Sequence, residues 1–198
     1  MIKKLLSVIC VLSLVLMLGA CSNSKNEGSS TETTTSSQTH SDVLVVVFSQ
    51  TGHTKEIAEK IASIENADLY GIVASDPYTE EDLNYNNSRS RATVEQNDPS
   101  ARPEIGSETI DLSGYSKIYV GYPIWFGQEP RIMDTFVEKY DFGDATVIPF
   151  CTSGSSGIGS SGTNLAKNAG SGNWLEGKRF SSGASEDEVR EWIENIQK

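Results

Sequence analysis

The feature that most constrains the fold is the run Val43–Phe48, which leads directly into a polar turn and a helical pattern. The run is continuously apolar and rich in valine, which is typical of a strand buried on both faces of a parallel sheet. After the turn, apolar residues recur at helical spacing at Ile57, Ala58, Ile61 and Ala62. The sequence therefore predicts a strand, a turn at its carboxyl end, and a helix.

Strand and helix patterns alternate along the rest of the chain. Further strands are predicted at Asp68–Ala74, Lys117–Tyr122 and Ala145–Cys151, with a poorer one around Trp174–Phe180. Helices are predicted from the apolar face Ile132, Met133, Phe136, Val137 and Tyr140, from a weak pattern at Ile158–Ala169, and after a capping box formed by Ser185 and Glu188. This alternation indicates an α/β fold, a parallel sheet covered by helices on both faces.

One segment, Ser75–Ser116, departs from the alternation. It is long and polar, and it contains Pro77, Pro99 and Pro103. A helix is predicted somewhere within Thr79–Gln96, although the apolar periodicity there is poor.

Residues 1–20 have the layout of a secretory signal: two lysines, an apolar stretch, and small residues before Cys21. The sequence LGAC that ends at Cys21 resembles a bacterial lipobox, which implies cleavage before Cys21 and lipidation of that cysteine. An ordinary secretion signal with a chance cysteine is the alternative. We expect an extracytoplasmic lipoprotein of a bacterium, attached to the membrane through its lipid anchor only.

Residues 21–41 form the next unit, in which Ser22–Ser41 contains no large apolar residue. Such a composition cannot bury a core, so we expect a disordered tether with a span of roughly 25 Å. Residues 42–198 then have the size of one domain.

Charge and cysteine content exclude several classes of function. The net charge is −11, and removal of the leader would take away two further lysines. Because nucleic-acid binding requires basic patches, we expect no nucleic-acid partner. Cys151 is the only thiol of the predicted domain, so no internal disulfide is possible there. Two histidines without a cysteine cluster give no pattern for a zinc site.

Ligands of parallel sheets bind beyond the carboxyl ends of the strands, which directs attention to three loops. The first loop, after the first strand, consists of Ser49, Gln50, Thr51, Gly52, His53 and Thr54. Glycine lets the backbone turn so that N–H groups converge at a helix N-terminus, and the hydroxyls add further donors. The loop suits a bound phosphate, and an ordinary strand-to-helix turn is the alternative. It lacks the Gly-Lys-Ser/Thr of a nucleotide triphosphatase loop.

The second and third loops have contrasting compositions. The second loop is GYPIWFG, residues 121–127, whose adjacent Trp125 and Phe126 suit either a stacked flat ligand or a local core. The third loop begins at Thr152 and is rich in serine and glycine, so its N–H groups suit the polar edge of a ring. A flexible connector is the alternative there, and Cys151 is interpreted as a buried strand thiol rather than a nucleophile.

With these three motifs in this order, the domain resembles the flavodoxin family, in its short-chain bacterial branch with a Y-P-x-W loop. The resemblance implies a flavodoxin-like three-layer sandwich, a five-stranded parallel sheet in the order 2-1-3-4-5, and bound FMN. It implies that the first loop holds the phosphate through Ser49, Gln50, Thr51, Gly52, His53 and Thr54. It places the ring between Pro123, Ile124, Trp125, Phe126 and Gly127 on one side and Thr152, Ser153, Gly154 and Gly157 on the other.

The sequence departs from the resemblance in the third loop, which lacks the tyrosine that stacks on the outer flavin face in many flavodoxins. One face of the ring is therefore expected to be open. The resemblance favours an FMN-binding electron-transfer protein whose partner is a redox protein or a small electron acceptor. The alternatives are an FMN-dependent NAD(P)H:quinone-type reductase, which an open face suits, and a non-redox binding module on a flavodoxin scaffold.

Overall fold

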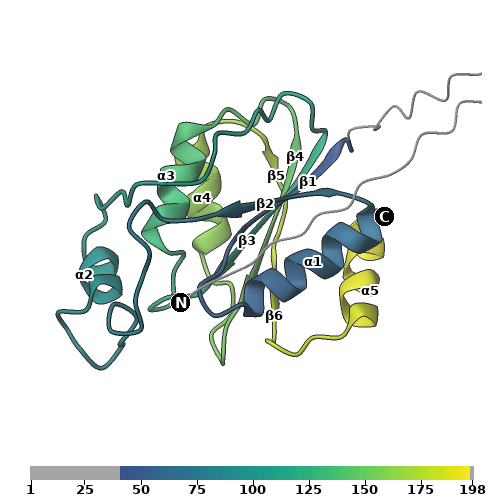
Figure 1. Cartoon of the computed structure of the whole chain (residues 1–198). Helices are drawn as coiled ribbons and strands as arrows, with labels where there is room; N and C mark the ends of the chain where they lie inside the picture. Colours follow the sequence, from purple (N-terminus) through teal and green to yellow (C-terminus); the bar gives the residue numbers. More distant parts are fainter. Residues whose placement is uncertain (1–40, 197–198) are drawn as a thin grey trace, which may run out of the picture. The chain divides into compact units, whose positions relative to one another are not determined.

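The computed structural model describes residues 41–196 (Figure 1), so the predicted signal peptide, most of the tether and Cys21 lie outside the described residues. In chain order the elements are β1 (Val43–Phe48), α1 (His53–Glu65), β2 (Asp68–Ile72), α2 (Arg91–Asn97), β3 (Lys117–Pro123), α3 (Arg131–Lys139), β4 (Thr146–Thr152), α4 (Ser161–Ala169), β5 (Asn173–Trp174), β6 (Lys178–Phe180) and α5 (Glu186–Ile196). Within residues 41–196, none of the helices combines the length and apolar character needed to cross a membrane.

The strands form one parallel sheet in the order β2-β1-β3-β4-β5, which confirms the predicted fold. The predicted last strand is two short segments, because β5 and β6 both pair with β4. Val147 pairs with Trp174 and Phe150 pairs with Lys178, so the interruption lies opposite Pro149. Proline has no N–H to donate to a ladder, which accounts for the break at this point.

Helices cover both faces of the sheet, as Figure 1 shows. Alternate residues of β1 point to opposite faces, and every one of them is buried. Leu44, Val46 and Phe48 belong to the core under α3 and α4. Val43, Val45 and Val47 belong to the core under α1 and α5. The continuous apolar run therefore reflects a strand at the centre of a three-layer sandwich.

Two predicted helix starts have different outcomes. The Ser185 hydroxyl accepts the N–H of Glu188 at 3.1 Å, so the serine half of the predicted capping box is present at α5. The helix predicted within Thr79–Gln96 begins only at Arg91, and turns occupy most of the residues before it. In those turns Asp82 accepts hydrogen bonds from the N–H and hydroxyl of Thr79, at 2.9 and 2.7 Å, which fixes a turn instead of a helix.

Residues 73–116, which we call the arm, connect β2 to β3 and include α2. Figure 1 shows the arm and α2 beyond α3, at the side of the molecule where α1 begins. An antiparallel bridge between Ala74 and Ile105 closes the base of the arm. Tyr78 packs edge-on against Phe48 of β1, with ring centroids 6.0 Å apart. The arm is therefore part of the folded domain at the carboxyl end of β1.

Candidate functional site

The first loop turns the chain from β1 into α1. Gly52 has a φ of +89°, a left-handed conformation that glycine adopts without steric cost. The first N–H to close a helical turn is that of Glu56, at 2.9 Å from the Gly52 carbonyl. The N–H groups of the preceding residues at this helix N-terminus therefore have no partner within the helix. Among residues 41–196, no hydrogen bond occupies the hydroxyls of Ser49 or Thr51.

The hydroxyl of Thr54 has a different role from those of Ser49 and Thr51. Thr54 is 1% exposed, and its oxygen lies 2.7 Å from the hydroxyl oxygen of Thr152, which is also buried. This hydrogen bond joins the first loop to the third loop. Thr54 thus fixes the spacing of two loops, and its hydroxyl does not line the cavity between them.

The second loop ends in a tight turn. Trp125 and Gln128 exchange two N–H···O=C hydrogen bonds, at 2.9 and 3.0 Å. The two residues between them, Phe126 and Gly127, have φ values of +49° and +80°. Positive φ at both central positions defines a type I′ turn, and it is unusual for a bulky residue such as phenylalanine. Such strain is often located at functional sites.

The two aromatic residues of this turn lie in different environments. Trp125 is 4% exposed and meets Phe48 and Tyr78 edge-on, with ring centroids 5.5 and 5.2 Å away. Phe126 is 45% exposed, and its ring centroid lies 4.9 Å from that of Tyr85 in the arm. The core interpretation therefore holds for Trp125, whereas Phe126 remains on the surface.

The third loop is tied down by a basic side chain from β6. The Arg179 guanidinium donates to the carbonyls of Ser153 and Gly154, at 2.6 and 3.2 Å, and its Nε donates to the Ser153 hydroxyl at 3.2 Å. The Ser153 hydroxyl in turn donates to the carbonyl of Ser156. These contacts fix the start of the third loop, so it is more than a flexible connector.

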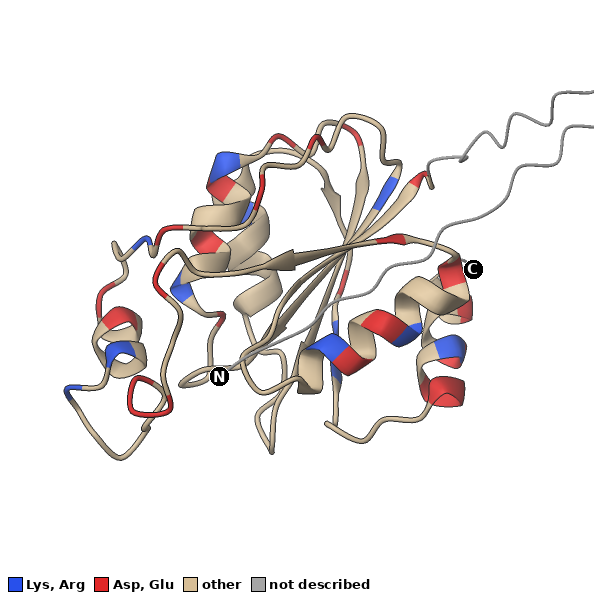
Figure 2. Cartoon of the chain, in the orientation of Figure 1, with Lys and Arg blue, Asp and Glu red and all other residues tan. Residues whose placement is uncertain are grey.

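The three loops enclose a cavity of about 440 Å³ at the carboxyl ends of β1, β3 and β4. Its lining residues are Ser49, Gln50, Thr51, His53, Leu83, Tyr85, Pro123, Ile124, Trp125, Thr152, Ser153, Gly154 and Ser182. None is an acid, a lysine or an arginine. Charged residues lie on the helices, on the arm and on some strands in Figure 2. The three loops themselves contain no aspartate, glutamate, lysine or arginine. The cavity thus offers neutral donors on one side and apolar surface on the other.

Ten of the fifteen residues named from the resemblance line this cavity: Ser49, Gln50, Thr51, His53, Pro123, Ile124, Trp125, Thr152, Ser153 and Gly154. The other five lie in the same loops without lining it: Gly52, Thr54, Phe126, Gly127 and Gly157. Gly52 and Gly127 shape turns through their positive φ, and Thr54 joins two loops. The structure therefore brings together all three motifs, with distinct roles for lining and shaping residues.

Leu83, Tyr85 and Ser182 also line the cavity and were not predicted. Leu83 and Tyr85 belong to the arm, whose weak periodicity hid their position. The available signal was the presence of these two large residues in an otherwise polar stretch. Ser182 follows β6 and carried no recognisable signal.

A buried polar cluster, which consists of Gln96, Glu129, Arg131 and Asp134, is hydrogen-bonded to the second loop. The Gln96 amide donates to the carbonyls of Trp125 and Glu129, both at 3.1 Å, and accepts the N–H of Arg131 at 3.2 Å. Arg131 also pairs with Asp134 at 3.3 Å. Burial raises the pKa of the Glu129 carboxyl above its usual value. Through Gln96, the arm therefore anchors the turn that carries Trp125.

Cys151 is fully buried on β4, as the sequence predicted. Burial raises the pKa of its thiol to about 12, although the nearby Arg179 acts in the opposite direction. The thiol is therefore protonated at neutral pH and is no nucleophile.

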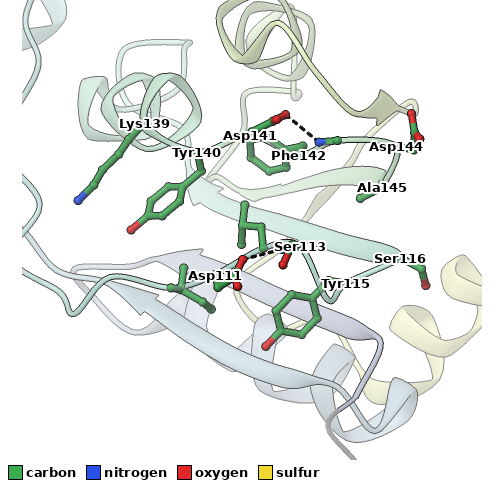
Figure 3. A pocket seen from close by; sticks show the side chains of 13 residues that line it. Asp111, Ser113, Tyr115, Ser116, Lys139, Tyr140, Asp141, Phe142, Asp144 and Ala145 are labelled. Atoms are coloured by element: carbon green, nitrogen blue, oxygen red, sulfur yellow. Dashed lines mark hydrogen bonds between the residues drawn. The ribbon is translucent and has the colours of Figure 1, made fainter.

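A larger cavity of about 610 Å³ lies at the opposite ends of β3 and β4 (Figure 3). It is formed by the segments that directly precede these strands, residues 110–116 and 139–145. Two of its aspartates accept hydrogen bonds from nearby backbone. Asp111 accepts the N–H of Ser113, and Asp141 accepts the N–H of Gly143, both at 2.9 Å. Both are turn-stabilising contacts. Since ligands of parallel sheets bind at the carboxyl ends, the smaller cavity is the candidate site.

The described domain is similar to proteins of known family and structure. The sequence profile of the flavodoxin family matches residues 42–196. The solved structure of a candidate flavoprotein from Bacteroides eggerthii is 43% identical, with a TM-score of 0.73, and the match covers 79% of this chain and 98% of that one. A candidate flavoprotein from Bacteroides uniformis is 39% identical, with a TM-score of 0.74 and coverages of 78% and 99%.

A more distant solved structure is that of a flavoprotein from Lactobacillus acidophilus in complex with FMN. It is 24% identical, with a TM-score of 0.59, and the match covers 76% of this chain and 97% of that one. No curated protein sequence matches the chain.

Proposed function

The chain belongs to the flavodoxin family, and on that premise we propose that it binds FMN in the cavity between the three loops and serves as a lipid-anchored electron carrier. The observation that carries this proposal is the convergence of the three loops on one uncharged cavity with unused donors at a helix N-terminus. FMN is supported by the family and by the FMN-containing Lactobacillus acidophilus flavoprotein.

The first loop fits the phosphate of FMN. The hydroxyls of Ser49 and Thr51 are free of hydrogen bonds among the described residues, and the α1 N-terminus presents further N–H donors. A helix N-terminus alone contributes only about 0.3–1 kcal/mol to anion binding. A hydrogen bond to a charged group contributes roughly 1.5–3 kcal/mol. Several neutral donors acting together are therefore sufficient, and no lysine or arginine is needed in the lining.

The rest of the cavity fits a flat ring. Its volume of about 440 Å³ lies within the range of small-molecule sites. Pro123, Ile124 and Trp125 supply apolar surface on one side, and the third loop supplies backbone groups on the other. Arg179 keeps the third loop in place by occupying the carbonyls of Ser153 and Gly154, at 2.6 and 3.2 Å.

Bound FMN would supply the redox chemistry, since it accepts and donates electrons. The chain's own residues bind it, exclude water from it and set its electrostatic surroundings. Because no cationic side chain lines the cavity and the chain carries a net charge of −11, the protein stabilises added negative charge poorly. We therefore expect a low reduction potential for the bound cofactor.

The proposed location is outside the cytoplasm, on a bacterial membrane. Its support is the lipobox-like LGAC sequence that ends at Cys21, followed by a polar tether. A lipid on Cys21 would hold the domain near the membrane surface, where it would exchange electrons with a redox protein or a small acceptor. Mass spectrometry of membrane-extracted protein would test this, because an unmodified or uncleaved N-terminus would exclude the anchor.

The first test of the function is the absorbance spectrum of the purified protein, before and after addition of FMN. We expect the visible bands of oxidised flavin, and quenching of the fluorescence of added FMN. Colourless protein that leaves FMN fluorescence unchanged would exclude the flavin functions in favour of a binding module. With FMN bound, steady NAD(P)H oxidation in the presence of a quinone would identify a reductase, whereas its absence would support the carrier.

A further inference from the structure

Of the aromatic residues at the cavity, Trp125 has little free surface to offer a ligand. It is 4% exposed, and Phe48 and Tyr78 both meet it edge-on. The third loop, from Thr152 to Gly159, contains no aromatic residue. Neither Trp125 nor the third loop therefore offers a flat ligand a large aromatic surface.

Tyr85 lines the cavity, and about half of its surface is exposed to solvent. It is 51% exposed, although the chain around it is close enough to raise the pKa of its hydroxyl through desolvation. One side of its ring is supported by Phe126, with ring centroids 4.9 Å apart and an interplanar angle of 54°. Aromatic pairs of this geometry are favourable, so Phe126 steadies Tyr85 without covering it fully.

The arm that carries Tyr85 is attached to the second loop, which also lines the cavity. Tyr78 packs against Trp125, and Gln96 binds the carbonyls of Trp125 and Glu129. The ring of Tyr78 is itself covered by the Arg91 guanidinium, 4.0 Å from its centroid, and its hydroxyl donates to Glu95 at 2.5 Å. These anchors lie on both sides of Tyr85 in the sequence, so the position of Tyr85 is built into the fold.

We propose that Tyr85 is the aromatic residue on which the flavin ring stacks, with Phe126 supporting it from the outside. This inference rests on the proposed function and deepens it. On this proposal the arm supplies the aromatic partner that the third loop lacks, in place of the open face expected from the sequence. Access to the ring is thereby limited, which favours electron exchange at an edge of the ring over a substrate bound on its face.

The test compares the binding of FMN and of riboflavin, which has the same ring without the phosphate, to the purified protein by fluorescence titration and calorimetry. Stacking of a heteroaromatic ring on an aromatic side chain contributes enough that Tyr85→Leu should weaken both ligands by the same factor, about tenfold. Tyr85→Phe keeps the ring and should stay within about twofold of the wild type. The matched control is Val94→Ala, since Val94 is also on the arm and is 54% exposed but does not line the cavity.

The possible outcomes separate the inference from the function on which it rests. Wild-type protein that binds neither ligand overturns both. Wild-type protein that binds FMN while Tyr85→Leu binds both ligands unchanged overturns only the role of Tyr85. A loss for FMN without a loss for riboflavin also overturns it, because the contact would then be to the phosphate. Thermal unfolding of Tyr85→Leu should match that of the wild type, as expected for a half-exposed side chain.

Discussion

The two sides of the cavity are built in opposite ways. The first loop, between β1 and α1, leaves its donors free, since no hydrogen bond among the described residues occupies the hydroxyls of Ser49 or Thr51. The arm binds its polar groups to itself and to the second loop, through Tyr78 and Gln96. One side thus keeps its hydrogen-bonding capacity for a ligand, and the other uses it to place an aromatic surface. Changes in the first loop should therefore alter binding, and changes in the arm's anchors should alter stability.

The largest expected effect comes from Gln96→Ala. It removes the Gln96 hydrogen bonds to two buried carbonyls and one buried N–H, and the Trp125 carbonyl keeps only the N–H of Gln128. A buried polar group that loses its partner costs about 1–3 kcal/mol. We expect the free energy of unfolding to fall by about 3 kcal/mol in urea denaturation. Gln50→Ala, a glutamine of the first loop that lines the cavity, is the matched control and should change it by less than about 0.5 kcal/mol. If Gln96→Ala and Gln50→Ala lost the same free energy of unfolding, the contrast between the arm and the first loop would be wrong.

Thr51→Val should weaken FMN binding and leave the stability of the protein nearly unchanged. Thr51 is exposed and lines the cavity, so its loss removes a donor to the phosphate without disturbing the core. We expect FMN affinity to fall by about tenfold, riboflavin affinity to stay unchanged, and stability to change by less than about 0.5 kcal/mol. Thr51→Ser, which keeps the hydroxyl, should bind FMN like the wild type. An equal loss of riboflavin affinity would argue against a phosphate contact at this residue.

The contrast between the two sides also explains what could be predicted from the sequence. The first side is local: β1 was predicted with its observed bounds, and the turn at Gly52 and helix α1 follow it directly in the chain. Both β-branched apolar runs and helical spacing are short-range patterns. The strand order and the convergence of the three loops followed from the family resemblance and the general behaviour of parallel sheets.

The second side could not be predicted because its contacts join distant parts of the sequence. Gln96 reaches the carbonyls of Trp125 and Glu129, and nothing in the local pattern around Gln96 distinguishes it from a solvated residue. The turns before α2 are held by Thr79 and Asp82, whose hydrogen bonds compete with helix formation. The position of Tyr85 in the cavity lining depends on both features, which is why it was not predicted.

Gly52→Ala tests the backbone of the first loop with a smaller expected effect. Nothing lies within 4 Å of an added Cβ at this position, so the cost comes only from the φ of +89°. A non-glycine residue in a left-handed conformation costs about 1–2 kcal/mol, and we expect a loss of about 1 kcal/mol in urea denaturation. Gly71→Ala in β2 is the control, because its Cβ would also meet nothing within 4 Å and its φ is ordinary. Similar losses at both glycines would show that the left-handed turn is not needed.

The last and smallest effect concerns the pH dependence of stability at the buried polar cluster, where the arm meets the second loop. Burial raises the pKa of Glu129 from its usual value of 4.5, so its contribution to stability is complete below that value and is lost as the pH rises through the folded-state pKa. Glu129→Gln should therefore gain stability relative to the wild type between about pH 4 and about pH 7.

Glu138 offers the opposite case, because its hydrogen bonds to Arg102, at 2.7 and 2.8 Å, lower its pKa. Its contribution is present above the usual pKa of 4.5 and is lost as the pH falls through the lowered folded-state pKa. Glu138→Gln should therefore be less stable than the wild type by a constant amount above about pH 5, and this difference should shrink below that pH. Urea denaturation from about pH 3 to about pH 7 measures both differences in unfolding free energy. A difference between Glu129→Gln and the wild type that does not grow with pH would show that the Glu129 carboxyl is hydrated rather than enclosed by the arm.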